Sequence, residues 1–201
     1  MASLLLSGSA PPVQSAIEQY QKIASYQVQI RTTSDNQTSV FLYFFKKPGY
    51  VRVELQKPYK GAVLIYDPVK KQARLWPFGR QSLPALTLRP DNRLIKSPSG
   101  QRIDQSDVGT LFQNTKTLQS HGKTDLLGVA RLGDKDTVHL IVEGDTGFSV
   151  ASVHRYQLWL DPATGFPVKV NSYNTAGQLL ETVEMEALEL NPDFPDDFFD
   201  Q

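Results

Sequence analysis

The chain has 201 residues and no net charge at neutral pH, because 21 Lys and Arg residues balance 21 Asp and Glu residues. That balance argues against a nucleic-acid-binding protein, whose surface needs excess cations, and the absence of cysteine excludes disulfides and cysteine-ligated metals. Hydrophobic residues make up 40% of the chain, enough for a substantial core, but the longest apolar runs are too short for a membrane-spanning helix.

The first twelve residues are small and polar and end in proline, so we expect residues 1–12 to be a disordered leader before a single domain over residues 13–201. Leu6-Ser7-Gly8 fits the residues that precede the lipidated cysteine of a bacterial lipoprotein, with Ser9 in the cysteine's place. An artificial expression leader is an equal alternative. Either way we expect an exported, periplasmic protein, tethered to a membrane if its native N-terminus carries a lipid.

The first half of the domain is expected to form one helix followed by a β-meander. Pro11 and Pro12 open the helix, in which apolar residues recur at helical spacing. From Tyr26 the apolar period changes to two, which indicates strands. We expect one strand to begin at Tyr26 and others to cover residues 38–47, 50–56, 61–66 and 71–76, joined by short turns.

The second half begins with a crossover over residues 77–105, which we expect to be long and irregular. A second helix follows, capped by Ser106 or Asp104. Strands are predicted near residues 127–132, 136–143, 153–160, 166–174 and 178–190, before an acidic, aromatic closing segment over residues 193–199. About ten strands and two or three short helices indicate one α+β domain dominated by an antiparallel sheet.

Catalytic chemistry finds little support in the sequence. The chain has no nucleophile elbow, dinucleotide-binding loop or phosphate-binding loop. Its histidines, His121, His139 and His154, lack the spacing of a metal site. We therefore predict that the protein is not an enzyme and holds no metal or cofactor; catalysis by Asp or His residues of the crossover ranks last among the alternatives.

The strongest signal is the apolar surface on the strand predicted over residues 38–47. Tyr43 and Phe45 lie on one face of this strand, and Leu42 and Phe44 lie on the other, so both faces need cover. Aromatic strands usually pack as ordinary core. The alternative is a concave face that lines a cavity for acyl chains, and periodicity alone leaves both possibilities open.

Two segments resemble the bacterial lipoprotein-carrier family of LolA-like proteins. The first is Phe44-Phe45-Lys46-Lys47-Pro48-Gly49-Tyr50-Val51-Arg52-Val53-Glu54, followed by Asp67 at the next hairpin. The second is Leu158-Trp159-Leu160-Asp161-Pro162-Ala163-Thr164-Gly165-Phe166-Pro167-Val168-Lys169, followed by a closing Phe198. Their order and spacing extend the resemblance over residues 13–200.

The resemblance implies an unclosed, strongly curved antiparallel β-barrel whose mouth is covered by helices. Strand parity places the family's lipid-binding cavity lining at Tyr43, Phe45, Val51, Val53 and Leu55. By the same parity we add Tyr26, Val28, Ile30 and Leu64, with Val108, Leu111 and Phe112 from the second helix. In the family an Arg before the Pro bonds to the helical lid; here Lys47 stands in that place, and Lys cannot make the forked contact of Arg.

The resemblance implies a monomeric periplasmic carrier that holds lipid or lipoprotein acyl chains for transfer towards the outer membrane. Its partners would be an acylated lipoprotein or lipid, an inner-membrane release complex and an outer-membrane receptor. The alternative is an envelope-stress sensor of the same fold, which binds lipid or mislocalised lipoprotein and contacts a membrane-anchored partner.

Overall fold

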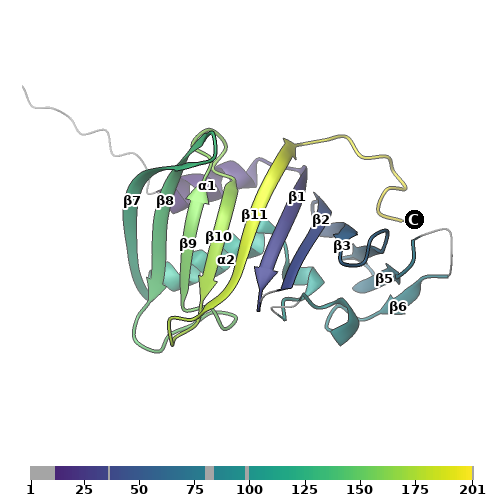
Figure 1. Cartoon of the computed structure of the whole chain (residues 1–201). Coiled ribbons are helices and arrows are strands. Elements are labelled where there is room, and N and C mark those ends of the chain that lie inside the picture. The colour runs from purple at the N-terminus through teal and green to yellow at the C-terminus, as the bar shows by residue number, and fades with distance from the viewer. Residues whose placement is uncertain (1–11, 36, 80–83, 98–99, 201) are drawn as a thin grey trace, which may run out of the picture.

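The computed structural model describes residues 12–35, 37–79, 84–97 and 100–200. Its elements in chain order are α1 (Pro12–Gln21), β1 (Ser25–Ser34), β2 (Gln37–Lys46), β3 (Tyr50–Lys57), β4 (Val63–Asp67), β5 (Gln72–Trp76), β6 (Leu86–Leu88), two 3₁₀ turns (Arg93–Ile95 and Ile103–Gln105), α2 (Val108–Ser120), β7 (Gly122–Leu132), β8 (Lys135–Gly144), β9 (Arg155–Leu160), β10 (Pro167–Tyr173) and β11 (Leu179–Leu190) (Figure 1).

The described strands form one eleven-stranded antiparallel sheet in the order β6-β5-β4-β3-β2-β1-β11-β10-β9-β8-β7. Two meanders, β1–β6 and β7–β11, meet where β1 pairs with β11. Strands β6 and β7 stand at opposite edges, so the sheet does not close. The expected fold class, an unclosed antiparallel sheet with a helical cover, is confirmed.

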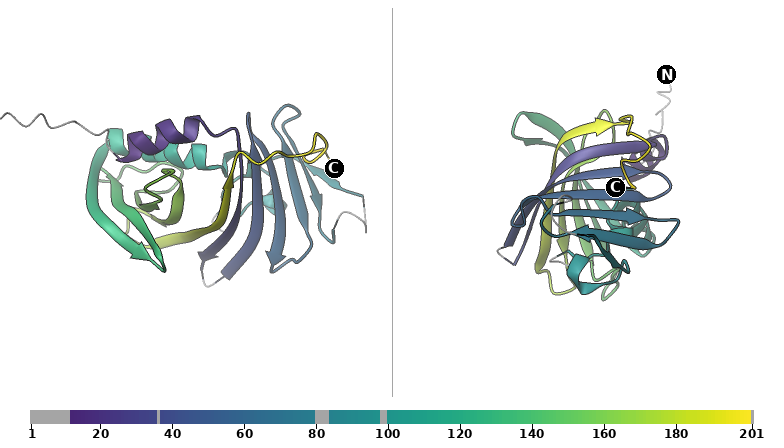
Figure 2. Two further views of the ribbon diagram at one scale, coloured as in Figure 1. Left: turned by 90° about the horizontal axis from the view of Figure 1, so that it is seen from above. Right: turned by 90° about the vertical axis from the view of Figure 1, so that its right-hand side faces the viewer.

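Both helices lie on the same side of the curled sheet, over the half that contains β7–β11 (Figure 2). Helix α2 contacts β7, β8 and α1. We call the side covered by the helices the inner face and the opposite side the outer face. Neither described helix is long and apolar enough to cross a membrane.

Helix α2 begins later than the sequence suggested, by one residue if Ser106 were the cap and by three if Asp104 were. Its N-cap is Asp107, whose Oδ1 accepts a hydrogen bond of 3.2 Å from the Thr110 amide. The proposed caps Ser106 and Asp104 were wrong, because both side chains are used in the preceding turn. Ser106 Oγ donates to the Ile103 carbonyl at 2.8 Å, and Asp104 pairs with an arginine of the same turn.

The N-terminal leader falls mainly outside the described residues, which begin at Pro12, already the first residue of α1. At the other end of the second helix, β7 starts at Gly122, five residues before the expected strand. A Cβ on Gly122 would lie 2.0 Å from the Glu143 carbonyl oxygen, so only glycine allows the start of β7 to lie this close to the end of β8. His154 lies just before β9 rather than within a strand.

The crossover contains less irregular structure than expected, because β6 and the two 3₁₀ turns lie within it. Its apolar residues Ile95 and Ile103 are buried in the cluster on the inner face. The crossover therefore covers part of the sheet that the helices leave open.

Candidate lipid-binding face and its helical cover

The inner face carries the larger of two apolar clusters, and the structure places every predicted lining residue in it. Ten of these side chains are buried, and Leu55 and Leu111 are half-buried against them. The twelve come from four strands and one helix: Tyr26, Val28, Ile30, Tyr43, Phe45, Val51, Val53, Leu55, Leu64, Val108, Leu111 and Phe112. That they contact a ligand stays a prediction.

Tyr26 lies at the centre of this face and is only 1% exposed. Its ring stacks on Phe45 at 5.1 Å between centroids and on Tyr43 at 6.0 Å. Phe166, from the turn before β10, packs edge-to-face on Tyr26 at 5.1 Å. Sequence reasoning did not assign Phe166 to the lining, although it belongs to the second family motif.

Three tyrosine hydroxyls hold the start of α2, one from α1 and two from the inner face of the sheet. The Tyr20 hydroxyl donates to Asp107 Oδ1 at 3.3 Å, and the Tyr26 hydroxyl accepts from the Val108 amide at 3.2 Å. The Tyr43 hydroxyl lies 2.9 Å from the Ser106 hydroxyl. Burial raises the pKa of all three phenols, which keeps them neutral as hydrogen-bonding groups. We call Tyr20, Tyr26 and Tyr43 the tyrosine contacts.

Lys47 reaches the helical cover, as the resemblance implied. Its Nζ donates to the carbonyl oxygen of Gln21, the last residue of α1, at 2.7 Å, and lies 5.8 Å from the centroid of the Tyr20 ring. A single lysine donor replaces the forked arginine contact. The contact is observed, whereas control of lid opening by Lys47 remains a prediction.

The second family motif has a structural role beside α1. Asp161 Oδ1 accepts hydrogen bonds from the amides of Ala163 and Thr164, at 2.9 and 2.8 Å, and so fixes the turn between β9 and β10. Gly165 in this turn has φ +67°, and a Cβ there would lie 2.9 Å from the Ala16 Cα of α1. The turn therefore supports the helix at van der Waals distance.

A row of polar side chains crosses one end of β9, β10 and β11 on the inner face, beside apolar residues such as Leu158 and Val170. Tyr156, Ser172 and Glu181 are buried there, and Tyr156 pairs with Ser172, which pairs with Glu181. Burial raises the pKa of Tyr156 to about 12, with a smaller contribution from the Glu181 charge. An amphiphile on the inner face would thus meet apolar side chains on β1–β4 and a few polar groups at one end of β9–β11.

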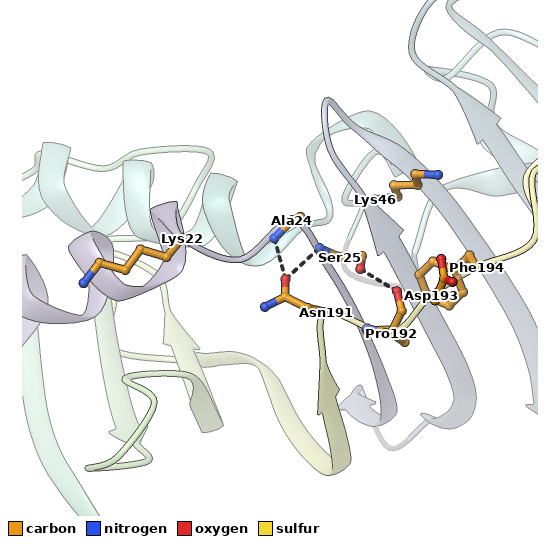
Figure 3. A pocket seen from close by; sticks show the side chains of 8 residues that line it. All are labelled: Lys22, Ala24, Ser25, Lys46, Asn191, Pro192, Asp193 and Phe194. Carbon is orange, nitrogen blue, oxygen red and sulfur yellow. Dashed lines mark hydrogen bonds between the residues drawn. The ribbon is translucent and has the colours of Figure 1, made fainter.

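A surface pocket of about 500 Å³ lies outside the inner cluster, between the end of α1 and the segment after β11 (Figure 3). Its lining includes Lys22, Lys46, Asp193 and Phe194. In Figure 3 the two lysines extend away from each other. The pocket thus lacks convergent cationic groups for an anion. Among the described residues, no group of three or more His, Asp or Glu side chains is placed to hold a metal ion.

Sequence similarity places the chain in one protein family. A family model, the MucB/RseB N-terminal domain, matches residues 86–201, more than half of the chain. The chain belongs to this family. No curated protein matches the chain.

Solved structures show the same fold at low sequence identity. An uncharacterized conserved protein from Thermus thermophilus superimposes with a TM-score of 0.58 at 11% identity, over 95% of this chain and 94% of that one. LprF from Mycobacterium bovis gives 0.55 at 10% identity, over 92% and 94%. The Pseudomonas aeruginosa MucA/MucB complex contains a chain that gives 0.52 at 18% identity, over 91% of this chain but 59% of that one.

This MucB/RseB domain thus spans about three fifths of the matched chain in the MucA/MucB complex. At such identities the likeness shows the fold alone. The resemblance to LolA-like proteins is confirmed at the level of the family and the fold.

Proposed function

We propose that this domain binds the acyl chains of a lipid or lipoprotein on the inner face of β1–β4, beneath α1, α2 and the crossover. The observation that carries the proposal is the convergence of twelve apolar side chains, from four strands and α2, under a cover made of short separate pieces. No catalytic group is required, and the domain would act in the periplasm.

Binding requires the cover to move, because the lining residues are buried against protein in the described conformation. Helix α1 joins β1 through only three residues, 22–24, and its main polar ties are the Lys47 bond to Gln21 and the Tyr20 bond to Asp107. An acyl chain gains about 0.8 kcal/mol per buried methylene, so about ten methylenes contribute roughly 8 kcal/mol. Such a gain exceeds the cost of breaking two hydrogen bonds at about 0.5–1.5 kcal/mol each. The acyl chain would also have to replace the apolar contacts that Val13, Ala16 and Tyr20 of α1 make in the inner cluster.

Native mass spectrometry with solvent extraction tests the proposal. We expect co-purified lipid, or added palmitate, at about one or two molecules per chain. Leu55 on β3 and Leu42 on β2 form a matched pair, because both are half-buried but lie on the inner and outer face respectively. Leu55→Ser should weaken palmitate binding, whereas Leu42→Ser should leave it unchanged. An apo mass together with no uptake of palmitate would rule out the acyl-binding function.

A regulatory role is the second candidate, and the family match favours it. The related MucB forms a complex with MucA. In this alternative, acyl binding on the inner face would change the affinity of the domain for a membrane-anchored protein.

A transfer assay separates the two roles. A carrier should release a pyrene-labelled acyl lipid to acceptor vesicles within minutes, because its affinities before and after lid opening differ. A regulatory domain should retain the lipid until its partner is added. Retention without any effect of lipid on partner binding would argue against both roles.

A further inference from the structure

The segment after β11 forms a cover of its own on the outer face. Residues 191–200 leave the end of β11 and run across to the strands of the other meander (Figure 1). Three phenylalanine rings of this segment, those of Phe194, Phe198 and Phe199, pack with one another and against a second apolar cluster. That cluster comprises Phe44, Val63, Ile65 and Trp76, with Leu42, Tyr50 and Ala85 at its border. We call residues 191–200 the tail and the surface beneath it the outer groove.

Two arginines of the outer groove bind the tail through its backbone. Arg52 Nη1 donates to the Phe198 carbonyl at 2.8 Å, and its guanidinium lies 4.4 Å from the centroid of the Phe198 ring. Arg74 Nη2 donates to the Phe199 carbonyl at 3.2 Å. Arg52 is only 8% exposed, so its orientation is built into the fold. These contacts recognise carbonyl groups and flat rings, which another aromatic segment with the same turn can offer.

The tail is acidic and the groove contains two arginines, of which Arg52 is also paired with Glu54 at 2.7 Å. The tail carries four carboxylates, those of Asp193, Asp196, Asp197 and Asp200. The groove contributes the guanidinium groups of Arg52 and Arg74. The tail forms no strand or α-helix, so it shares no ladder of backbone hydrogen bonds with the sheet. Its attachment therefore depends on three rings and a few polar contacts.

We propose that the outer groove is a docking site for an acidic, phenylalanine-containing segment of a partner protein that turns as residues 195–200 do, and that the tail occupies this site when the partner is absent. The bound tail itself shows the chemistry that the groove accepts. A covalently attached segment competes at an effective concentration in the millimolar range. A partner segment must therefore bind more tightly than the tail or be presented at high local concentration.

Displacement of the tail from the groove by a partner segment would also affect the helical cover of the inner face. Asn191, the first tail residue, accepts hydrogen bonds from the amides of Ala24 at 2.7 Å and Ser25 at 3.4 Å, at the junction of α1 and β1 (Figure 3). Ser25 Oγ donates to the Pro192 carbonyl at 2.9 Å. Loss of these bonds would loosen the junction. Only this consequence rests on the proposed acyl-binding function; docking at the groove does not.

Peptide binding to the full chain tests the proposal. The probe is a fluorescein-labelled peptide with the sequence of residues 193–200, followed by fluorescence anisotropy. F198S/F199S removes two anchoring rings and should free the groove, so we expect this variant to bind the peptide at least about tenfold more tightly than the wild type. Adding Arg52→Met to it should reduce binding about tenfold. Tyr59→Ser, at a residue that is 69% exposed and outside the groove, is the matched control and should behave as wild type.

Circular dichroism and thermal melting establish that each variant is folded, and Phe198→Ser alone replaces the double variant if that one unfolds. Equal or absent binding of the peptide to the wild type and to a folded tail variant would overturn the proposal, because the rings would then be ordinary core. Binding that survives Arg52→Met would also overturn it, since the peptide would then lie elsewhere. None of these readouts involves lipid, so failure here is distinguishable from failure of acyl binding.

Discussion

The inner and outer faces of β2–β5 are made by the same alternating strands, yet they are covered in different ways. On β2, Tyr43 and Phe45 point to the inner face, and Phe44 points to the outer face. The inner side is covered by two helices and the crossover, with polar ties at Lys47 and the tyrosine contacts. The outer side is covered by a ten-residue tail. An alternating strand thus specifies two apolar faces, and the cover decides what each can bind.

The largest expected effect is on stability at the inner face. Leu158 is 0% exposed on β9, in the part of the sheet that the helices cover. Leu158→Ala should lower the free energy of unfolding by about 2–5 kcal/mol, because it leaves a cavity in packed core. Phe199→Ala on the outer face should cost clearly less, since the tail can detach without global unfolding. Urea denaturation checks both, and equal losses would contradict the distinction between the two covers.

High pH should lower the stability of the fold through the buried phenols of the inner face. The pKa of Tyr156 is about 12 in the folded chain and about 10 when unfolded, so folding favours its neutral form. This stabilisation is complete below pH 10 and is lost as the pH rises to 12, at up to about 1.4 kcal/mol per pH unit.

Tyr156→Phe should therefore make the loss of stability between pH 10 and 12 shallower than in the wild type. Urea denaturation at pH 8, 10 and 11 measures the slope. An unchanged slope would mean that the Tyr156 phenol ionises in the folded chain as readily as in the unfolded chain.

A smaller effect is expected where the two covers meet. Asn191→Ala removes the hydrogen bonds to the Ala24 and Ser25 amides, worth about 0.5–1.5 kcal/mol each. It also places Ala at φ +53°, which Asn tolerates better. Amide hydrogen exchange should accelerate at Ala24 and Ser25 and along α1, with β8 and β9 as internal controls. Acceleration confined to the tail would show that the tail and the lid are independent.

The smallest effect is expected for Lys47, which is exposed. Lys47→Met removes one hydrogen bond to the end of α1 and should lower stability by no more than about 1 kcal/mol. Its kinetic effect should be larger: stopped-flow uptake of a fluorescent fatty acid should be faster than in the wild type. Lys47→Arg keeps a donor and should restore the slower rate. Identical uptake rates in all three proteins would show that Lys47 does not control opening of the cover.

The sequence was sufficient to predict most of the sheet. Alternation in β1, β2 and β3 predicted which side chains share a face, and all twelve proposed lining residues lie in one cluster. Prediction failed where local patterns are ambiguous. Three residues that could cap a helix, Asp104, Ser106 and Asp107, precede α2, and only the folded turn shows that Asp107 caps it. The start of β7 has no apolar alternation, because this edge strand is mostly exposed.

The sequence alone could not predict what each face of the sheet contacts, for a physical reason. Phe44 and Phe45 are equally apolar, and only contacts distant in the chain distinguish their surroundings. Phe45 meets Tyr26 under the helical cover, whereas Phe44 meets Phe194 and Phe198 of the tail. The aromatic spacing of the tail could have indicated a docked segment, but nothing local identifies the surface that it covers.

Photolabelling tests the central claim most directly. A palmitate analogue with a diazirine near its methyl end is irradiated with the purified protein, and labelled peptides are mapped by mass spectrometry. We predict labels on residues 26–30, 43–55 and 108–112, with unlabelled palmitate as competitor. Labelling confined to the exposed β7 edge or the outer groove, or labelling that palmitate does not suppress, would contradict an acyl-binding site on the inner face.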